Sequence, residues 1–170
     1  MAIQMIFCVE TTKKADTDSI YLTEILNFRY AITNQVKISK IYMGTKSKYN
    51  SKEVLKEIER KTKEFIIGET KIIYCIDTDA YESNYEHQRE LEDIERFCAQ
   101  KGYELIWFCH DVEDVFLGRQ ITDSEKVKEA ATFRRKRMIE QVDDRKLAVC
   151  ALRKNTSNIL TVLDKYLEKK

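Results

Sequence analysis

The sequence predicts an α/β fold: one domain over residues 1–170, with a parallel four-stranded sheet, helices on both of its faces and further helices at the C-terminal end. Three observations predict it. Strand-like runs alternate with helical periodicity, two of these runs contain a continuous apolar segment (residues 72–76 and 105–108), and no linker or repeat interrupts the chain. Strands joined by helices pair in parallel, and a parallel strand that is buried on both faces reads as a continuous apolar run.

The expected strands are four runs rich in β-branched and aromatic residues. They cover residues 3–9, 36–43, 71–76 and 103–109. Amphipathic periodicity between these runs predicts three helices. The helices are expected over residues 17–31, 51–67 and 84–101.

Shorter helical patterns follow the fourth run. They cover residues 112–117, 124–141 and 157–168. Polar side chains that accept hydrogen bonds from the first free backbone N–H groups favour helix starts. Asp123 or Ser124 is therefore the expected cap of the second of these helices, and Thr156 or Ser157 that of the third.

Composition excludes several classes of protein. The chain is 43% hydrophobic and 35% charged, which is too apolar for a disordered chain and too charged for a membrane protein. We expect a soluble cytoplasmic protein, because no signal peptide or uncharged membrane-length stretch is present. The net charge of +1 provides no global field toward nucleic acid or membrane, so any such contact requires a local patch.

The five cysteines are widely spread, lack any C-x-x-C spacing and lie mostly among apolar residues. This pattern is typical of buried free thiols. A zinc site that uses Cys109, His110 and a distant cysteine is conceivable but disfavoured, because structural zinc ligands usually come in closely spaced pairs. A catalytic cysteine is disfavoured too, since neither histidine of the chain sits in a recognisable motif.

Acidic residues follow two of the expected strands. Glu10 comes directly after the first strand, and Asp77 and Asp79 come directly after the third. The carboxyl ends of parallel strands meet at one edge of a sheet, so these three carboxylates should lie together. Carboxylates without histidine or thiolate ligands suit Mg²⁺ or Mn²⁺, and the predicted chemistry is metal-assisted phosphoryl transfer or phosphodiester hydrolysis.

A plainer interpretation remains open. Asp79 could cap a turn, Asp77 could accept hydrogen bonds from loop amides, and Glu10 could be solvated. A D-x-D motif of the glycosyltransferase type is disfavoured, because such enzymes need a larger chain to hold both sugar donor and acceptor.

The residues Phe7-Cys8-Val9-Glu10 and Ile73-Tyr74-Cys75-Ile76-Asp77-Thr78-Asp79 resemble the Toprim signature, a glutamate after the first strand and a D-x-D after the third. More narrowly, the chain resembles RloB-like proteins of bacterial antiphage and restriction-associated loci over nearly its whole length. The resemblance implies a Toprim-like fold and a Mg²⁺-dependent nuclease with Glu10, Asp77 and Asp79 as catalytic residues and metal ligands.

The surroundings of that motif suggest further site residues. Glu113 and Asp114 are candidates for a fourth acidic ligand, although acids also favour the first turn of a helix. Lys13 and Lys14 in the loop after the first strand could neutralise a phosphate, although solvated loop lysines are common. Thr11 stands where the family usually has glycine.

The densest positive charge lies in the expected helix over residues 124–141, at Arg134-Arg135-Lys136-Arg137. Arg134, Arg135 and Arg137 are candidate contacts to a nucleic-acid backbone, because each neutralised phosphate releases counterions and strengthens binding. The alternative is a solvated surface helix, balanced in part by neighbouring glutamates.

Two functions remain. The first is a Mg²⁺-dependent Toprim-like nuclease that acts on DNA or RNA, and the resemblance implies a role in bacterial defence. The second is a non-catalytic binding or regulatory module of a defence complex with an ATPase partner. Retention of Glu10, Asp77 and Asp79 favours the first, and Thr11 favours the second.

Overall fold

A computed structural model describes all 170 residues. Its centre is a four-stranded, all-parallel sheet in the order β2-β1-β3-β4, as predicted. The strands are β1 (Ala2–Val9), β2 (Val36–Tyr42), β3 (Gly68–Asp77) and β4 (Glu104–Phe108). The order places β1 and β3 at the centre, so the strands that precede Glu10 and end in Asp77 are direct neighbours.

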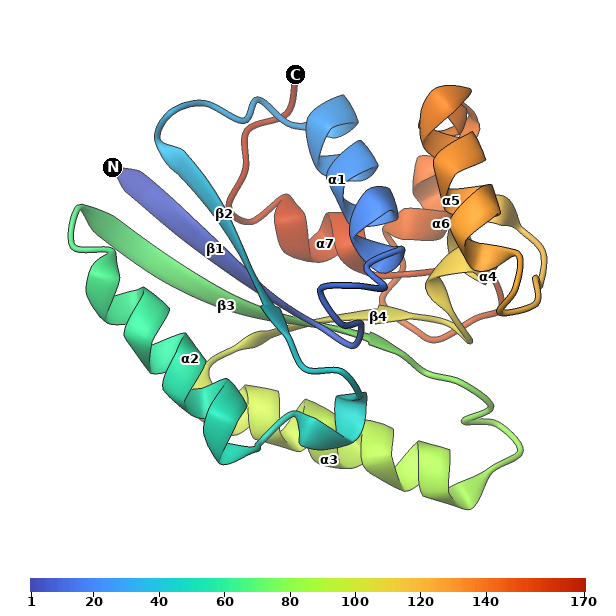
Figure 1. Ribbon diagram of the computed structural model, residues 1–170, viewed down its shortest axis with the longest axis horizontal. Helices are drawn as coiled ribbons and strands as arrows, with labels where there is room; N and C mark the ends of the chain where they lie inside the picture. Colours follow the sequence, from blue (N-terminus) through green and yellow to red (C-terminus); the bar gives the residue numbers. More distant parts are fainter.

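Helices cover both faces of the sheet and give it a Rossmann-like α/β architecture (Figure 1). One face carries α2 (Lys52–Glu64) and α3 (Tyr85–Lys101). The other face carries α1 (Asp18–Arg29), α4 (Val112–Leu117), α5 (Lys126–Arg135), α6 (Asp144–Leu147) and α7 (Ile159–Leu163). No helix in the structure has both the length and the apolar character needed to span a membrane.

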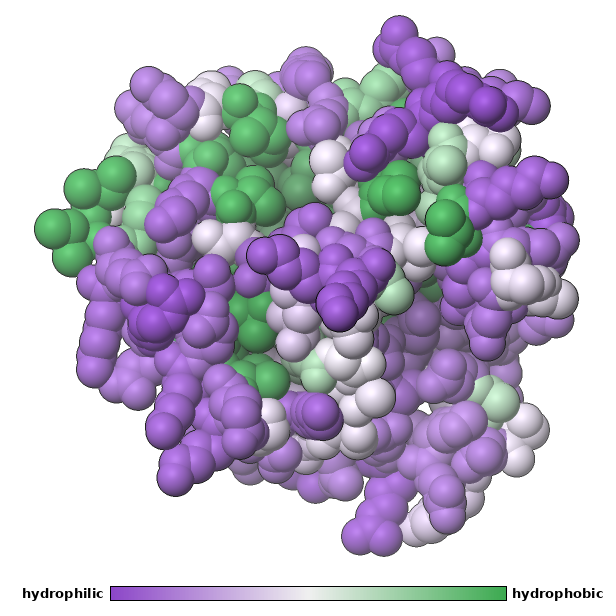
Figure 2. All heavy atoms as spheres, viewed as in Figure 1, coloured by the Kyte–Doolittle hydropathy of each residue, from purple (hydrophilic) through white to green (hydrophobic).

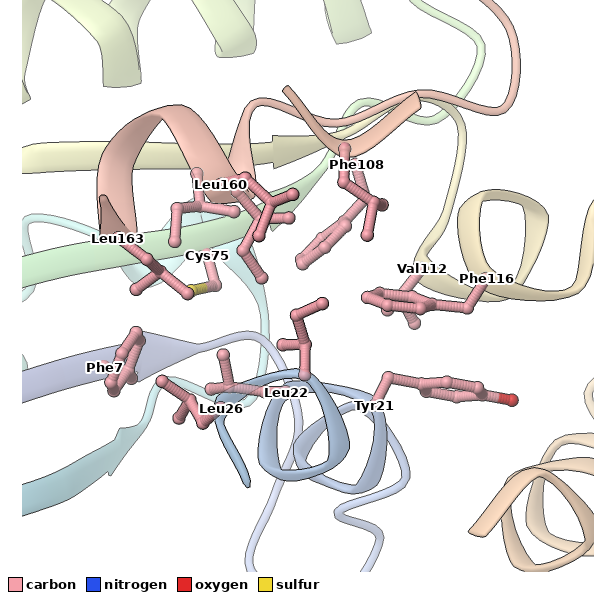
Figure 3. Packing of buried hydrophobic residues seen from close by; sticks show 14 of the residues in the cluster. Phe7, Tyr21, Leu22, Leu26, Cys75, Phe108, Val112, Phe116, Leu160 and Leu163 are labelled. Carbon is pink, nitrogen blue, oxygen red and sulfur yellow. The ribbon is translucent and has the colours of Figure 1, made fainter. Parts of the chain in front are cut away.

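Two apolar cores lie on the two faces of the sheet. Alternate strand residues divide between them: Phe7 and Ile73 face one core, while Ile6 and Tyr74 face the other. Figure 3 shows the larger core, in which Leu22 and Leu26 of α1 pack toward the sheet and toward the C-terminal segments. Hydrophilic side chains cover most of the surface seen in Figure 2, where apolar side chains form only small separate patches.

Local signals explain the helix ends that match the prediction. The side chain of Asn84 caps α3 by accepting from the backbone N–H groups of Glu86 and His87, and Gly102 ends the helix in the left-handed region at φ 69°. Gly68 does not end a helix but begins β3. A Cβ at this position would lie 1.8 Å from the carbonyl oxygen of Ala2, so the close approach of β1 and β3 requires glycine.

Of the three helices predicted after β4, α4 has the predicted bounds, and the other two are shorter than predicted. The expected helix over 124–141 is wrong as one element: α5 ends at Arg135, Arg137 takes a left-handed conformation at φ 52°, and a 3-10 turn, η2 (Met138–Gln141), follows. Its expected cap is also wrong, because Glu125 occupies the N-cap position without a side-chain cap bond. Similarly, α7 covers only Ile159–Leu163, and its N-cap residue is Asn158.

Candidate functional site

The carboxyl ends of β1 and β3 join two of the predicted site residues. The backbone N–H of Asp77 donates to Oε2 of Glu10 at 2.5 Å. The strand register explains this contact, because β1 pairs with β3 as far as Val9 and Cys75, and Glu10 follows Val9 directly while β3 continues to Asp77. Glu10 and Asp77 therefore meet as the strand-end rule predicts.

Three further carboxylates surround this pair. Asp18 begins α1, Asp111 caps α4 by accepting from the N–H of Asp114 at 2.8 Å, and Glu113 lies in the first turn of α4. Glu113 is 0% exposed, and neither of its carboxylate oxygens has a hydrogen-bond partner. We call Glu10, Asp18, Asp77, Asp111 and Glu113 the acidic cluster.

Burial and mutual repulsion shift the acidity of this cluster. Burial, followed by the charges of Glu10 and Asp18, raises the pKa of Asp77 well above its ordinary value. Burial likewise raises the pKa of Glu10 to about 7, although the N–H of Asp77 opposes the shift. The pKa of Asp18 is raised to about 6 and that of Glu113 to about 7, in both cases mainly by burial.

Two lysines approach the acidic cluster from the two helical layers. Nζ of Lys126, in α5, lies 3.4 Å from Oε2 of Glu113. Although burial works in the opposite direction, the charges of Glu113, Asp111, Asp77 and Asp18 raise the pKa of Lys126 to about 12. Lys46 lies on the other side, in the 3-10 turn η1 (Lys46–Lys48), and is only 7% exposed.

Lys46 also determines where Asp79 points. Its Nζ donates to the carbonyl oxygen of Asp77 at 2.7 Å and pairs with the Asp79 carboxylate. Asp79 has a left-handed backbone at φ 50°, and its side chain is 46% exposed. The third predicted ligand is thus held by a lysine at the edge of the acidic cluster.

The loop between β1 and α1 is organised around Asp16. Its carboxylate accepts from the hydroxyl of Thr11 at 3.1 Å, the N–H of Ser19 at 3.3 Å and the hydroxyl of Tyr42 at 2.8 Å. Thr11 therefore has a structural role in fixing this loop. Lys13 and Lys14 project from the same loop, are exposed and form no ion pair.

The basic residues at the end of α5 differ in their contacts. Arg134 pairs with Glu24 at 3.1 Å, and Arg137 pairs with Glu140 at 2.6 Å. Arg135 is exposed and forms no ion pair. Of the three arginines predicted to contact nucleic acid, Arg135 alone thus forms no ion pair.

One group in the structure has donor atoms close enough to share a metal ion. Ligand atoms of Glu82, Cys109 and His110 all lie within 4.8 Å of one another. The predicted ligands Glu10, Asp77, Asp79 and Glu113 do not form such a group. The sequence had drawn attention to Cys109 and His110, but their partner is a glutamate from the loop after β3 and not a distant cysteine.

The sequence analysis did not identify Asp18 and Lys46 as site residues. It also did not place Asp111 among the clustered acids or Lys126 as a cation that pairs with them. The sequence does contain a signal for Asp111, because it follows the fourth strand and strand ends deliver side chains to the same edge of the sheet as Asp77. No comparable signal marks Lys46, which reaches the site only because the β2–α2 connection folds back over the sheet edge.

Comparison with known proteins finds no matching family model, no significantly similar curated protein and no significantly similar solved structure.

Proposed function

We propose that the acidic cluster binds Mg²⁺ or Mn²⁺ and that the protein is a Toprim-like nuclease, hydrolysing or transferring phosphodiesters of DNA or RNA. The observation that carries the proposal is the joining of Glu10 and Asp77 within a cluster of five carboxylates. Buried acids with strongly raised pKa values at the carboxyl edge of an α/β sheet have the location and the electrostatics of a functional site.

The residues of the acidic cluster fit a hard divalent cation. All the donors are carboxylate oxygens, and both oxygens of the buried Glu113 lack a hydrogen-bond partner. Five carboxylates face mainly two lysines, Lys46 and Lys126, so the cluster carries excess negative charge once it is ionised. Acids that repel one another stand further apart without an ion between them, and a bound cation would draw them together.

Each residue has a distinct role in the proposed reaction. Asp77, Glu10 and Glu113 would hold the cation, while Asp18 and Asp111 would add negative charge around it. The bound ion would supply charge stabilisation at the scissile phosphate. Glu10, which accepts from the backbone N–H of Asp77 beside the proposed ion, is the candidate general base.

The substrate would be drawn in by lysines and arginines near the cluster. Lys13 and Lys14 belong to the loop that leads from Glu10 to Asp18, so they are the nearest candidates for phosphate contacts. Arg135 ends α5, the helix that carries Lys126, and Arg137 lies in the turn that follows it. The resemblance to RloB-like proteins supports a place for this activity in bacterial antiphage defence.

The second candidate function is a binding module without turnover, acting with an ATPase partner. The ion pair between Lys46 and Asp79 favours the binding module, because the buried lysine occupies a carboxylate that was predicted to bind metal. This module would bind metal and nucleic acid but would not cleave.

Metal-dependent cleavage tests the proposal directly. Parent protein should cleave single- or double-stranded DNA or RNA when Mg²⁺ or Mn²⁺ is present, and Asp77→Asn should lower the rate by at least about 100-fold. Glu64→Gln, on the exposed surface of α2, is the matched control and should cleave like the parent. Metal-dependent stabilisation without cleavage by the parent would favour the binding module, and absence of both would refute the proposed metal site.

A further inference from the structure

A second group of donors lies beside the acidic cluster and has different chemistry. Nε2 of His110 lies 2.8 Å from Oε2 of Glu82. One potential ligand atom from each of Glu82, Cys109 and His110 lies within 4.8 Å of the other two. Imidazole, thiolate and carboxylate together suit zinc, a borderline-soft ion, better than Mg²⁺.

The backbone positions these donors firmly. The β3–β4 pairing continues past the strand ends, because the N–H of Thr78 donates to the carbonyl of Phe108 and the N–H of Asp79 to that of His110. The N–H of His110 in turn donates to the hydroxyl of Thr78 at 2.9 Å. These bonds accompany a left-handed conformation of His110 at φ 67°, which is uncommon for a residue other than glycine.

Asp114 provides an independent indication of a ligand. It is 1% exposed, and neither of its carboxylate oxygens has a hydrogen-bond partner. Its Oδ2 lies 3.6 Å from Nδ1 of His110, which is itself buried without a hydrogen-bond partner. A carboxylate behind one imidazole nitrogen is the usual support of a histidine that binds zinc through its other nitrogen.

The donors are also reachable by an ion. Glu82, His110 and Asp114 line an open cavity of about 650 Å³, together with His87. Cys109, the residue before His110, is buried and lies beneath this surface. Three protein ligands would leave one position of a tetrahedral zinc ion facing the cavity, open to water or to another ligand.

We propose that Glu82, Cys109 and His110 bind one Zn²⁺ ion, with Asp114 orienting the imidazole of His110. The ion would tie the loop over residues 78–84 to the end of β4, since Glu82 belongs to that loop and the other two ligands follow β4 (Figure 1). Because Asp79 lies in the same loop, zinc would fix the connection that borders the acidic cluster.

Zinc binding to the full-length protein tests the proposal. Protein stripped with a chelator is titrated with zinc against a chromogenic chelator, and bound metal is counted by mass spectrometry. We expect one tightly bound zinc per chain and a rise of about 5–10 °C in Tm at free zinc 100-fold above Kd. Cobalt in place of zinc should give the charge-transfer absorption of a thiolate ligand, which Cys109→Ser should remove.

The variants separate this site from weak surface binding. Glu82→Gln changes an exposed residue, so its fold should be intact, and its zinc affinity should fall by at least about 10-fold. Asp114→Asn should weaken binding by about 10–100-fold. Glu86→Gln and Cys150→Ser, at an exposed acid nearby and at the exposed cysteine, should bind zinc like the parent.

The outcome is independent of the nuclease proposal. Asp77→Asn should keep its zinc, and excess Mg²⁺ should not displace it. A parent protein that binds no zinc, a Glu82→Gln variant that binds as tightly as the parent, or loss of binding in Cys150→Ser would each overturn the zinc site. None of these results would bear on cleavage at the acidic cluster.

Discussion

The backbone N–H of Asp77 donates to the carboxylate of Glu10 at 2.5 Å, so a hydrogen bond joins the carboxyl ends of the two central strands. This bond stabilises the ionised form of Glu10, yet burial outweighs it and raises the pKa of Glu10 to about 7. The metal-free cluster is therefore a strained arrangement near neutral pH, and its pH dependence is open to measurement.

We expect the metal-free protein to lose stability as the pH rises from about 4.5 to about 7. In the unfolded chain Glu10 and Glu113 release their protons near the ordinary value of 4.5, whereas in the native state both have a pKa of about 7. The native state therefore binds more protons in this window, and the free energy of unfolding falls with rising pH, by on the order of 1–3 kcal/mol per group.

Urea unfolding at several pH values, in the presence of a chelator, measures how the free energy of unfolding changes with pH. Glu113→Gln should flatten it, because the variant removes one of the titrating groups. A free energy of unfolding that is constant or rises between pH 5 and pH 7 would contradict the buried ionisable cluster.

Lys126→Gln should destabilise the metal-free protein at pH 8 by about 1–3 kcal/mol. The substitution leaves the fully buried Glu113 without the cation that lies 3.4 Å from it. Mg²⁺ or Mn²⁺ should then raise the Tm of this variant more than that of the parent, because the ion replaces the lost charge.

Lys128→Gln is the matched control for Lys126→Gln, since Lys128 lies exposed on the same helix. Its Tm should match that of the parent with and without metal. Equal metal responses in Lys126→Gln and Lys128→Gln would place the ion away from Glu113.

Lys46→Met should release the Asp79 carboxylate and lower stability by about 1–3 kcal/mol, because a buried lysine that contacts two acceptors is lost. It should also weaken the acidity of Glu10, whose pKa the charge of Lys46 lowers. Thermal unfolding and the pH profile of cleavage check both effects, with Lys48→Met on the same turn as the control. An unchanged pH profile of cleavage would show that the charge of Lys46 does not control the pKa of Glu10.

Arg135→Gln combined with Arg137→Gln should weaken nucleic-acid binding and lower the slope of log Kd against log salt by about 1–2. Thermal stability should change little, because both side chains are exposed. Arg134→Gln is a useful comparison, since the pair between Arg134 and Glu24 joins α5 to α1, and its loss should affect stability more than loss of the local, exposed pair between Arg137 and Glu140. Unchanged binding and salt dependence in the double variant would show that these arginines are solvated and do not contact nucleic acid.

The parallel sheet was predictable because its signals are local and agree with one another. The apolar runs that became β3 and β4 carry no competing helical periodicity, and Asn84 and Gly102 mark the ends of α3. Glu10 and Asp77 were predictable as partners for a topological reason, since parallel strands deliver both to one edge.

The C-terminal half was less predictable because tertiary contacts determine it. Phe133 and Ile139 are both buried, but on a continuous helix they would point about 120° apart. The left-handed turn at Arg137 brings both into the core, and no glycine or proline marks it. The N-terminal end of the expected last helix is lost because Ser157 bridges to Phe108 of β4 instead.

Lys46 and Lys126 reach the acidic cluster from opposite faces of the sheet, which links the folding of the two cores. If the layer that carries Lys126 opened locally, Glu113 would lose its ion-pair partner, and if η1 opened, Glu10 and Asp79 would lose the charge of Lys46. Partial opening is thus penalised electrostatically, and the two halves should unfold as one cooperative unit. Native-state hydrogen exchange should accordingly show similar opening free energies for amides of α1 and α3, and metal should raise both together.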